Sequence, residues 1–392
     1  MPNARPNRHT LAEITTATTT RREPPLDRRA LLRRSAAGAA ALGGIASVDG
    51  FTVASAREAS PEASPAATPM ASPVAALPDL PVEQVAILTG DDPAATNQTG
   101  ERWEVFGTDL GSSFRFKDRT YLVFGDTFGE YKRDWRSNVL GISTDDDPTD
   151  GVTIDRMIED APGHAKEVLP SRKVDFEEMT VIPTYGVAVG DRIVLHYMSV
   201  SHWGEPGHWD LGAAGFAYSD DEGQTWTKDP DAILPGDTNW GQVAIEEHDG
   251  LLYLFGIPGG RYGDLKLARV APDALLHLDA WTYWDGADWG PAAGDAAVIV
   301  PGPVGELSVR WNSHYRRWLM MYLIDNEGII VLRTAEALTG PWSEARVVVR
   351  STDYPALYAP FLYPTWNDGP DIWFNMSMFG PYNVFLMRTS LE

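Results

Sequence analysis

The stretch GTDLGSSFRFKDRTYLVFGDTFGE, Gly107–Glu130, has the pattern of a β-hairpin, with two largely apolar runs meeting at the polar pair Lys117-Asp118. With a two-residue turn at this pair, the numbers of facing residues sum to 235, and those of Asp109 and Asp126 do so too. Directly opposed residues in an antiparallel pair have Cβ atoms about 4.5–5.5 Å apart, and like charges there are destabilising. This register therefore predicts an acid pair that serves function rather than stability.

The same hairpin pattern recurs four more times along the chain. Each copy has a strand, a polar turn and an aromatic second strand, and the second strands carry Phe124, Tyr197, Phe255, Tyr322 and Phe374 at intervals of 73, 58, 67 and 52 residues. These intervals fit propeller blades of about 40–50 residues with loop insertions. Further strand-like runs, such as AGFAYSD and GIIVLRTA, lie between the hairpins. We therefore predict an all-β, five-bladed β-propeller with four-stranded antiparallel blades.

One local motif supports this fold. SDDEGQTW, Ser219–Trp226, matches the pattern S-x-D-x-G-x-T-W of a hairpin turn that is common in sialidase-like propellers. We expect Asp221 to bind the backbone of the turn, Gly223 to adopt a positive φ and Trp226 to pack between sheets. The motif is structural and names no substrate.

The N-terminal part of the chain predicts export. The paired Arg28-Arg29 precedes a small, apolar run and then Ala54-Ser55-Ala56, which is the order of a twin-arginine signal with its cleavage site. A membrane anchor is the alternative, but the apolar run is too short and too rich in Gly and Ala to span about 30 Å of hydrocarbon. We therefore predict a cleaved signal at 1–56 and a secreted or extracytoplasmic protein.

Residues 57–81 form a spacer rich in Pro, Ala and Ser, which we expect to be disordered because it can bury little apolar surface. The predicted propeller module then occupies residues 82–392. Residues 61–392 hold 23 basic and 50 acidic residues, a formal charge of about −27, so nucleic acid and anionic lipid are excluded as partners of the mature protein. The chain has no Cys and therefore no disulfides. We expect a monomer that needs no cofactor.

In a propeller, ligands bind where the innermost strands begin. Residues at or just before these starts are the candidate site, and most of them are acids: Asp109, Asp126, Glu178, Gln242, Glu306 and Tyr358. Carboxylates that converge on one pocket have separated pKa values, so one group remains a general acid while another remains a base. Arg261, beside two glycines, is a candidate to orient a carboxylate or a sugar hydroxyl, and Trp203 is the best candidate stacking platform.

Each of these residues also has an ordinary structural interpretation. Glu178 and Glu306 fit equally well as solvated acids at strand ends in a chain with 55 acidic residues, and Arg261 also fits as a residue that pins a turn. His202 and His208 lie six positions apart in a Gly/Pro-containing loop without a matching carboxylate pattern, so a metal site there is the weaker interpretation. We predict no metal site.

Four motifs together resemble one known family: GTDLGSSF with YLVFGDTF, EEMTVIPT, GGRYGDLKLARV and GELSVRWN. The family is called domain of unknown function 4185, part of which is classified as glycoside hydrolase family 183, and the resemblance runs from about Arg102 to the C-terminus. It implies a five-bladed propeller, endo-acting cleavage of D-arabinan, and an inverting acid and base pair at the positions of Asp109 and Asp126. The polysaccharide substrate is therefore expected to be an arabinan-type or other furanoside glycan.

Inverting glycosidases hold their two carboxyl groups about 6.5–9.5 Å apart, and retaining enzymes about 5–5.5 Å. The direct register gives a separation near the lower range, which a strand bulge at Gly107, Gly111 or Gly125 would widen. Two alternatives remain. A non-catalytic glycan-binding propeller explains the aromatic and acidic residues but needs no close acid pair. A sialidase-like enzyme needs a cluster of three Arg and a Tyr nucleophile, where this chain offers acids.

Overall fold

The computed structural model describes residues 78–392, so the predicted signal and residues 57–77 of the predicted linker lie outside the described residues. Residues 78–81, at the end of the predicted linker, lie against the rest of the domain. The Leu80 amide donates to the Val347 carbonyl at 2.7 Å, and Asp79 pairs with Arg350. Within 78–392, no helix is long and apolar enough to cross a membrane.

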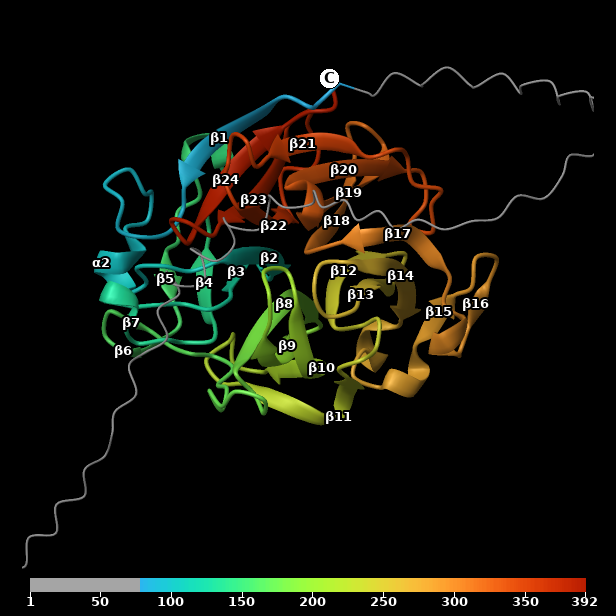
Figure 1. Cartoon of the computed structure of the whole chain (residues 1–392), viewed down its shortest axis with the longest axis horizontal. Coiled ribbons are helices and arrows are strands. Elements are labelled where there is room, and N and C mark those ends of the chain that lie inside the picture. The colour runs from blue at the N-terminus through green and yellow to red at the C-terminus, as the bar shows by residue number, and fades with distance from the viewer. Residues whose placement is uncertain (1–77) are drawn as a thin grey trace, which may run out of the picture. The chain divides into compact units, whose positions relative to one another are not determined.

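Five antiparallel sheets surround a common axis, as Figure 1 shows, which confirms the predicted five-bladed propeller. The chain enters each blade on its innermost strand. These inner strands are β2 (Leu110–Phe116), β8 (Thr180–Val189), β12 (Gln242–His248), β18 (Leu307–Asn312) and β22 (Leu357–Leu362).

Each inner strand forms a hairpin with the second strand of its blade, in the positions that the repeats predict. The second strands are β3 (Arg119–Phe124), β9 (Arg192–Trp203), β13 (Leu251–Ile257), β19 (Arg317–Ile324) and β23 (Ile372–Met378). Their marker residues, Phe124, Tyr197, Phe255, Tyr322 and Phe374, are all at most 4% exposed. The residues that mark the repeat in the sequence are therefore core residues, one in each blade.

The third strands also fall on the predicted runs. They are β4 (Val139–Ser143), β10 (Trp209–Ser219), β14 (Gly263–Val270), β20 (Ile329–Ala335) and β24 (Asn383–Thr389). The outermost strands of blades 1, 2 and 4 are β5 (Arg156–Met157), β11 (Thr227–Pro235) and β21 (Arg346–Arg350).

Blade 5 is completed by the other end of the described chain. Strand β1 (Val82–Ile87) pairs with β24, with Val82 opposite Thr389 and Ile87 opposite Phe385. Figure 1 shows the blue β1 beside the red β24. Because this pairing joins the two ends of the described chain in one sheet, it closes the ring and covers the edge that β24 would otherwise expose.

Blade 3 departs from the predicted four strands. Strand β14 pairs with both β15 (Thr282–Trp284) and β17 (Val298–Val304), and β16 (Trp289–Gly290) extends the sheet beyond β15. The insertion between β14 and β17 divides the outer position between two short strands. Blade 3 is therefore a six-stranded sheet rather than a four-stranded one.

A few short helices, turns and strands lie outside the blades. The helix α2 (Thr99–Trp103) and the two-stranded sheet of β6 (Glu159–Ala161) and β7 (His164–Ala165) accompany blade 1. In the described part of the chain, six 3₁₀ turns lie in loops: η1 (Glu130–Lys132), η2 (Pro148–Asp150), η3 (Pro272–Ala274), η4 (Leu278–Ala280), η5 (Ala293–Asp295) and η6 (Asp325–Glu327).

The motif at Ser219–Trp226 forms the turn between β10 and β11 and behaves as predicted. Asp221 accepts hydrogen bonds from the Thr225 amide at 2.8 Å and from its hydroxyl at 2.6 Å. Gly223 has a φ of 89°, and a Cβ there would lie 2.8 Å from Leu140 of blade 1. Trp226 packs against a hydrophobic cluster formed by blades 1 and 2. The turn therefore joins two blades.

Candidate active site

All five inner strands begin at the same end of the central channel, because every blade is entered in the same direction. We call this the entrance end, and the end at which the inner strands stop the far end. At the entrance end, β2 contains a bulge: Leu110 pairs with Phe124, whereas Ser112 pairs with Val123. Gly111 is the extra residue. Leu110 and Gly111 have φ values of 65° and 77°.

The bulge corrects the predicted register by one residue. The Gly125 amide donates to the carbonyl of Asp109 at 3.1 Å, so Asp109 lies opposite Gly125 and not opposite Asp126. A Cβ at Gly111 would lie 2.9 Å from Val384 of blade 5, which explains why a glycine occupies the bulge. The two aspartates are displaced along the hairpin rather than directly opposed.

The Asp109 carboxylate is held by two tyrosines of blade 5. The hydroxyls of Tyr358 and Tyr382 each donate to its Oδ2 at 2.9 Å. Its Oδ1 is buried without a hydrogen-bond partner, and a Cβ at Gly125 would lie only 2.4 Å from it. Gly125 therefore leaves the space that this carboxylate oxygen occupies.

The pKa of Asp109 is raised to about 7. Burial is the largest cause, the negative charges of Asp126 and Glu306 add to it, and the two tyrosine hydrogen bonds oppose the shift. A carboxyl group with this pKa is protonated in a large fraction of molecules at neutral pH. The pKa values of Tyr358 and Tyr382 are raised as well, by burial and by the charge of Asp109. Both tyrosines therefore remain hydrogen-bond donors.

Asp126 is buried in the segment that follows β3, with 4% of its surface exposed. Its Oδ1 accepts a hydrogen bond from the indole Nε1 of Trp135 at 2.8 Å and one from the hydroxyl of Thr180 at 2.6 Å. The donors come from the loop of blade 1 and from the first residue of β8. Two blades thus orient this carboxylate.

Glu306 and Arg261 form an ion pair beside the aspartates. The Nε and Nη2 of Arg261 donate to Glu306 Oε1 at 3.0 and 2.8 Å, and its Nη1 donates to Asp325 Oδ1 at 3.0 Å. Burial opposes the charge of Arg261, but Glu306 and Asp325 raise its pKa, so it remains a cation. Its guanidinium lies 5.0 Å from the ring centre of Tyr358, which links the ion pair to Asp109.

Gln242 supports Arg261 indirectly. Its Nε2 donates to the carbonyl of Gly260 at 2.7 Å, which fixes the loop that carries Arg261. Gln242 and Glu306 also border a small cavity of about 20 Å³ in the channel. These two predicted site residues are therefore brought to the same part of the entrance end.

Glu178 and Trp203 have other partners. Glu178 accepts hydrogen bonds from Ser199 Oγ at 3.0 Å and from the Arg172 amide at 3.1 Å, and lies 3.7 Å from the Lys228 ammonium. Glu178 was a candidate to raise the pKa of the catalytic acid, but the negative charges that raise the pKa of Asp109 are those of Asp126 and Glu306. Trp203 packs edge-on against Trp209, with ring centres 5.7 Å apart.

Sequence reasoning missed Tyr382, Trp135, Thr180 and Asp325. Tyr382 and Trp135 lie in loops between strands, so a rule that selects the starts of inner strands does not find them. Thr180 lies at such a start, but a threonine carries no charge that would distinguish it from the acidic Glu178 nearby in the sequence. Asp325 opens the 3₁₀ turn η6 directly after β19. The sequence signal that could have found the two loop residues is that each follows the second strand of a hairpin, which returns the chain to the entrance end.

Exposed aromatic side chains border the entrance end. Tyr131 follows β3, Phe176 precedes β8, Tyr262 follows β13 and Phe379 follows β23, and their exposed fractions are 80, 72, 36 and 44%. The histidines considered for a metal site support two of these rings. His202 stacks on Phe176 with ring centres 4.1 Å apart, and His208 stacks on Tyr262 at 4.4 Å.

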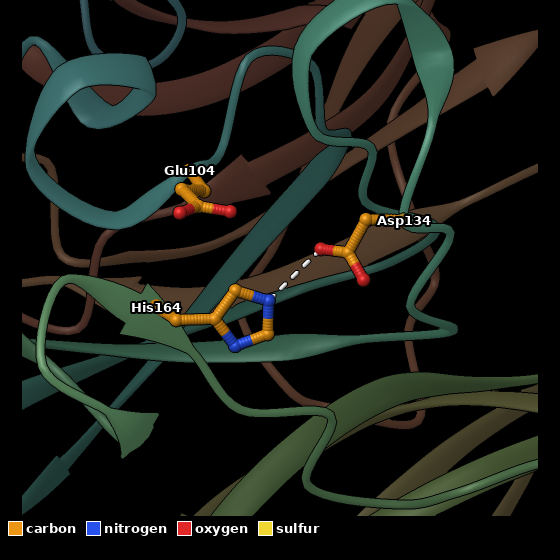
Figure 2. Close-up of side chains that lie close together, drawn as sticks. All are labelled: Glu104, Asp134 and His164. Carbon is orange, nitrogen blue, oxygen red and sulfur yellow. Dashed lines mark hydrogen bonds and ion pairs between the residues drawn. The ribbon is translucent and has the colours of Figure 1, made fainter.

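A different group of potential metal ligands lies beside blade 1: Glu104, Asp134 and His164 (Figure 2). His164 Nε2 lies 2.9 Å from Asp134 and its Nδ1 lies 2.5 Å from Asp160. Burial opposes protonation, but the hydrogen bonds with Asp160 and Asp134 raise the pKa of His164. The guanidinium of Arg136 also contacts Asp134, at 3.2 Å, so Asp134 and His164 take part in an ion-pair network.

Comparison with known proteins identifies the family. A family model described as domain of unknown function (DUF4185) matches residues 94–388. Notoamide biosynthesis cluster protein J of an Aspergillus species is 31% identical over 306 residues, which cover 71% of this chain and 79% of that protein. Protein J' of Aspergillus versicolor is also 31% identical, over 310 residues covering 72% of this chain and 82% of that one.

Solved structures share the fold at low sequence identity. A putative hydrolase from Bacteroides ovatus has a TM-score of 0.53 at 12% identity, covering 74% of this chain and 86% of that one. An exo-β-1,3-galactanase from Phanerochaete chrysosporium has a TM-score of 0.50 at 10% identity, covering 79% of this chain and 64% of that one. The family model over residues 94–388 and the two relatives at 31% identity show that this chain belongs to the DUF4185 family.

Proposed function

We propose that this protein is a secreted glycoside hydrolase that cleaves a furanose-containing polysaccharide, with endo-D-arabinanase-like activity. The observation that carries the proposal is the state of Asp109: a carboxyl group with a pKa of about 7 beside a second carboxyl group, Asp126. A general acid functions best with a pKa near the working pH, and an adjacent ionised carboxylate can activate water.

In this mechanism Asp109 is the general acid. It carries a proton near neutral pH, and its two tyrosine partners hold Oδ2 while Oδ1 has no hydrogen-bond partner. The proton passes from Asp109 to the oxygen of the glycosidic bond as that bond breaks. The resulting charge on Asp109 is stabilised by the hydroxyls of Tyr358 and Tyr382, which donate to a carboxylate more strongly than to a neutral acid.

Asp126 is then the general base, which removes a proton from the attacking water. Its carboxylate is oriented by Trp135 and Thr180 and stays near enough to Asp109 for its charge to raise the pKa of the acid. Water attacks the face of the sugar opposite the leaving group, so we propose inversion at the anomeric carbon. Glu306, neutralised by Arg261, remains available to accept a hydrogen bond from a sugar hydroxyl through Oε2.

The exposed aromatic rings at the entrance support a polymeric substrate. Tyr131, Phe176, Tyr262 and Phe379 come from four different blades and extend the apolar surface on several sides of the acid pair. Sugar rings stack on such surfaces through their C–H faces. A chain that crosses the entrance would contact several of these rings, which favours cleavage within a polymer.

The test is incubation of the module with D-arabinan, L-arabinan and other furanose and pyranose polymers, alongside the Asp109→Asn and Asp126→Asn variants. We expect each variant to lose turnover by about a thousandfold or more while it still binds glycan. Asp191→Asn, in the exposed turn between β8 and β9, is the matched control and should leave turnover unchanged. The anomer released first, read by NMR, reports inversion. Near-normal turnover in either site variant would contradict that residue's role.

A non-catalytic glycan-binding propeller is the second candidate. The ring of exposed aromatic residues favours it, and the curated relatives are named for a notoamide biosynthesis cluster rather than for a glycan. Glycan binding by the wild-type protein, without cleavage of any polymer in the panel, would support this candidate over the hydrolase.

Secretion is proposed on the sequence alone, because residues 1–56 lie outside the described residues. Changing both Arg28 and Arg29 to Lys should abolish export and leave soluble, folded module in the cytoplasm. Immunoblots of cell and culture fractions measure this directly. Unchanged secretion would contradict a twin-arginine signal.

A further inference from the structure

A second hollow opens at the far end of the channel. It has a volume of about 650 Å³ and is lined by residues from all five blades, among them Arg115, Val187, Glu246, Trp311 and Trp366. This volume lies within the range of small-molecule sites, about 300–1,000 Å³. None of the candidate residues at the entrance end borders this hollow.

The two ends of the channel are separated by packed side chains. Arg115 lies six positions after Asp109 along the segment that forms β2, and a strand rises about 3.3 Å per residue, so the two ends lie roughly 20 Å apart. Between them, the buried Tyr185 and Phe361 pack with ring centres 6.5 Å apart. A ligand in the far hollow therefore does not reach the acid pair.

The hollow has a buried hydrogen-bonding group in its wall. Arg310 is 8% exposed, its Nη1 is paired with Glu246, and its Nη2 donates to the carbonyl of Ser113 at 3.2 Å. Arg310 also interacts with the hydroxyl of Tyr185. The Oγ1 of Thr365, which also lines the hollow, has no hydrogen-bond partner. Buried polar groups are normally paired, so the Thr365 hydroxyl indicates a place where a polar ligand is recognised.

The walls add flat apolar surface. Trp311 is 38% exposed and is braced edge-on by Trp318, with ring centres 5.2 Å apart. Trp366 is fixed by a hydrogen bond from its Nε1 to the carbonyl of Asp146 at 2.9 Å. Both indoles are held by the protein itself, so little side-chain entropy is lost when a ligand stacks on them.

The charges of the lining select against an anion. Arg115 and Arg310 are opposed by Glu246, Glu247 and Asp368, so the carboxylates outnumber the guanidinium groups. Arg310 is already neutralised by Glu246. A phosphate or nucleotide would meet a net negative lining. A neutral ligand with several hydroxyl groups suits this surface, because it offers C–H faces to the indoles and both donors and acceptors to the polar atoms.

We propose that the far hollow is a second binding site, for a short neutral saccharide, with Trp311 as its stacking platform and Thr365 as a hydrogen-bonding partner. The site holds its ligand without cleaving it. It allows the propeller to retain a glycan strand at one end of the channel while chemistry proceeds at the other. The existence of this site does not depend on the hydrolase activity proposed for the entrance end.

The test uses calorimetric titration of the full module carrying Asp109→Asn, which prevents turnover of the probe. The probes are neutral arabino-, xylo- and galacto-oligosaccharides of three to six units, with an oligogalacturonate as the anionic counterpart. We expect at least one neutral probe to bind, and Trp311→Ala to weaken that binding event by about tenfold. Trp311→Phe should restore most of it. Trp289→Ala, on the outer edge of blade 3, is the matched aromatic control.

A binding event at the entrance end would keep its affinity in Trp311→Ala, so the two sites are told apart within one titration. If the hydrolase proposal fails, the Trp311-dependent event should still be present. Three results would each overturn the second site: no neutral probe binds, Trp311→Ala binds as well as its parent, or oligogalacturonate binds as tightly as the neutral probes.

Discussion

The two ends of the central channel are built from the same five strands but treat buried charge in opposite ways. At the far end, Glu246, whose side chain is 13% exposed, has a cation, Arg310, as its direct partner. At the entrance end, Asp109 has two tyrosine hydroxyls and a nearby second carboxylate. Once Glu246 and Arg310 are both removed from water, each stabilises the other, and removal of one destabilises the fold. The like charges of Asp109 and Asp126 instead raise the pKa of Asp109 and destabilise the fold.

This contrast gives the two ends different expected responses to mutation. A residue of the far pair should matter for folding and little for chemistry. A residue of the entrance cluster should matter for chemistry, and its removal should relieve the fold. Strained or electrostatically unfavourable arrangements are typical of functional sites, where they persist because the surrounding structure holds them.

The largest effect on stability should come from breaking the far pair. Arg310→Ala leaves the Glu246 carboxylate buried without its cation, so we expect a loss of about 3–5 kcal/mol in the free energy of unfolding. Urea unfolding followed by tryptophan fluorescence measures it. Removing both partners, in Arg310→Met with Glu246→Leu, should recover most of the loss.

The matched control is an exposed pair. Arg192 binds Asp220 at 2.7 Å on the surface, where Arg192→Ala should cost about 1 kcal/mol or less. Equal losses in Arg310→Ala and Arg192→Ala would mean that the far pair is not a buried structural ion pair, and the contrast between the two ends would fail.

The next effect concerns the acid itself. The Tyr382 hydroxyl lowers the pKa of Asp109, opposing its burial, so Tyr382→Phe should raise that pKa above about 7. The basic limb of the pH profile of kcat/KM should therefore move upward, by roughly one pH unit for one lost hydrogen bond to a charged group. A merely structural role for Tyr382 would lower turnover without moving the limb.

Tyr315→Phe is the control for this experiment, because the Tyr315 hydroxyl donates to the Pro370 carbonyl at 2.7 Å, away from the entrance. Its pH profile should match that of the wild-type protein. A basic limb that stays in place in Tyr382→Phe would show that Asp109 is not the group whose proton is delivered.

Much of this architecture was predictable from the sequence, for one physical reason. The hairpin repeat has a marker residue that must be buried in each blade, so its spacing locates five second strands. Entry of the chain on the inner strand then brings Asp109, Gln242, Glu306 and Tyr358 to one end of the channel. Local pattern and global geometry agree at these positions.

The remaining features depend on contacts that are distant in sequence. The bulge at Gly111 exists because β2 lies close to Val384 of blade 5, and no local signal reports that approach. Pairing of β1 with β24 joins segments about 300 residues apart in the chain. The paths of the loops that carry Trp135 and Tyr382 follow from neither strand period nor hairpin register, so the partners of both aspartates could not be assigned.

The smallest effect, and the one that tests the stability side of the contrast most directly, is that of Asp109→Asn on thermal unfolding. The pKa of the folded carboxyl is raised to about 7, above its ordinary value of 3.8, so the folded protein binds a proton that the unfolded chain releases between these pH values. The stability that comes from this proton is fully present below about pH 4 and is lost as the pH rises through 7. Asparagine does not titrate. Asp109→Asn should therefore match the wild-type Tm near pH 4 and exceed it by about 2–4 °C at pH 8. This shift corresponds to roughly 1 kcal/mol of stability, after allowance for the partial exposure of Asp109 to solvent. Asp191→Asn should show no such pH-dependent difference. If the Tm of the wild-type protein equals that of Asp109→Asn at every pH from 4 to 8, the entrance carboxylates do not destabilise the fold. The two ends of the channel would then differ in composition but not in their effect on stability.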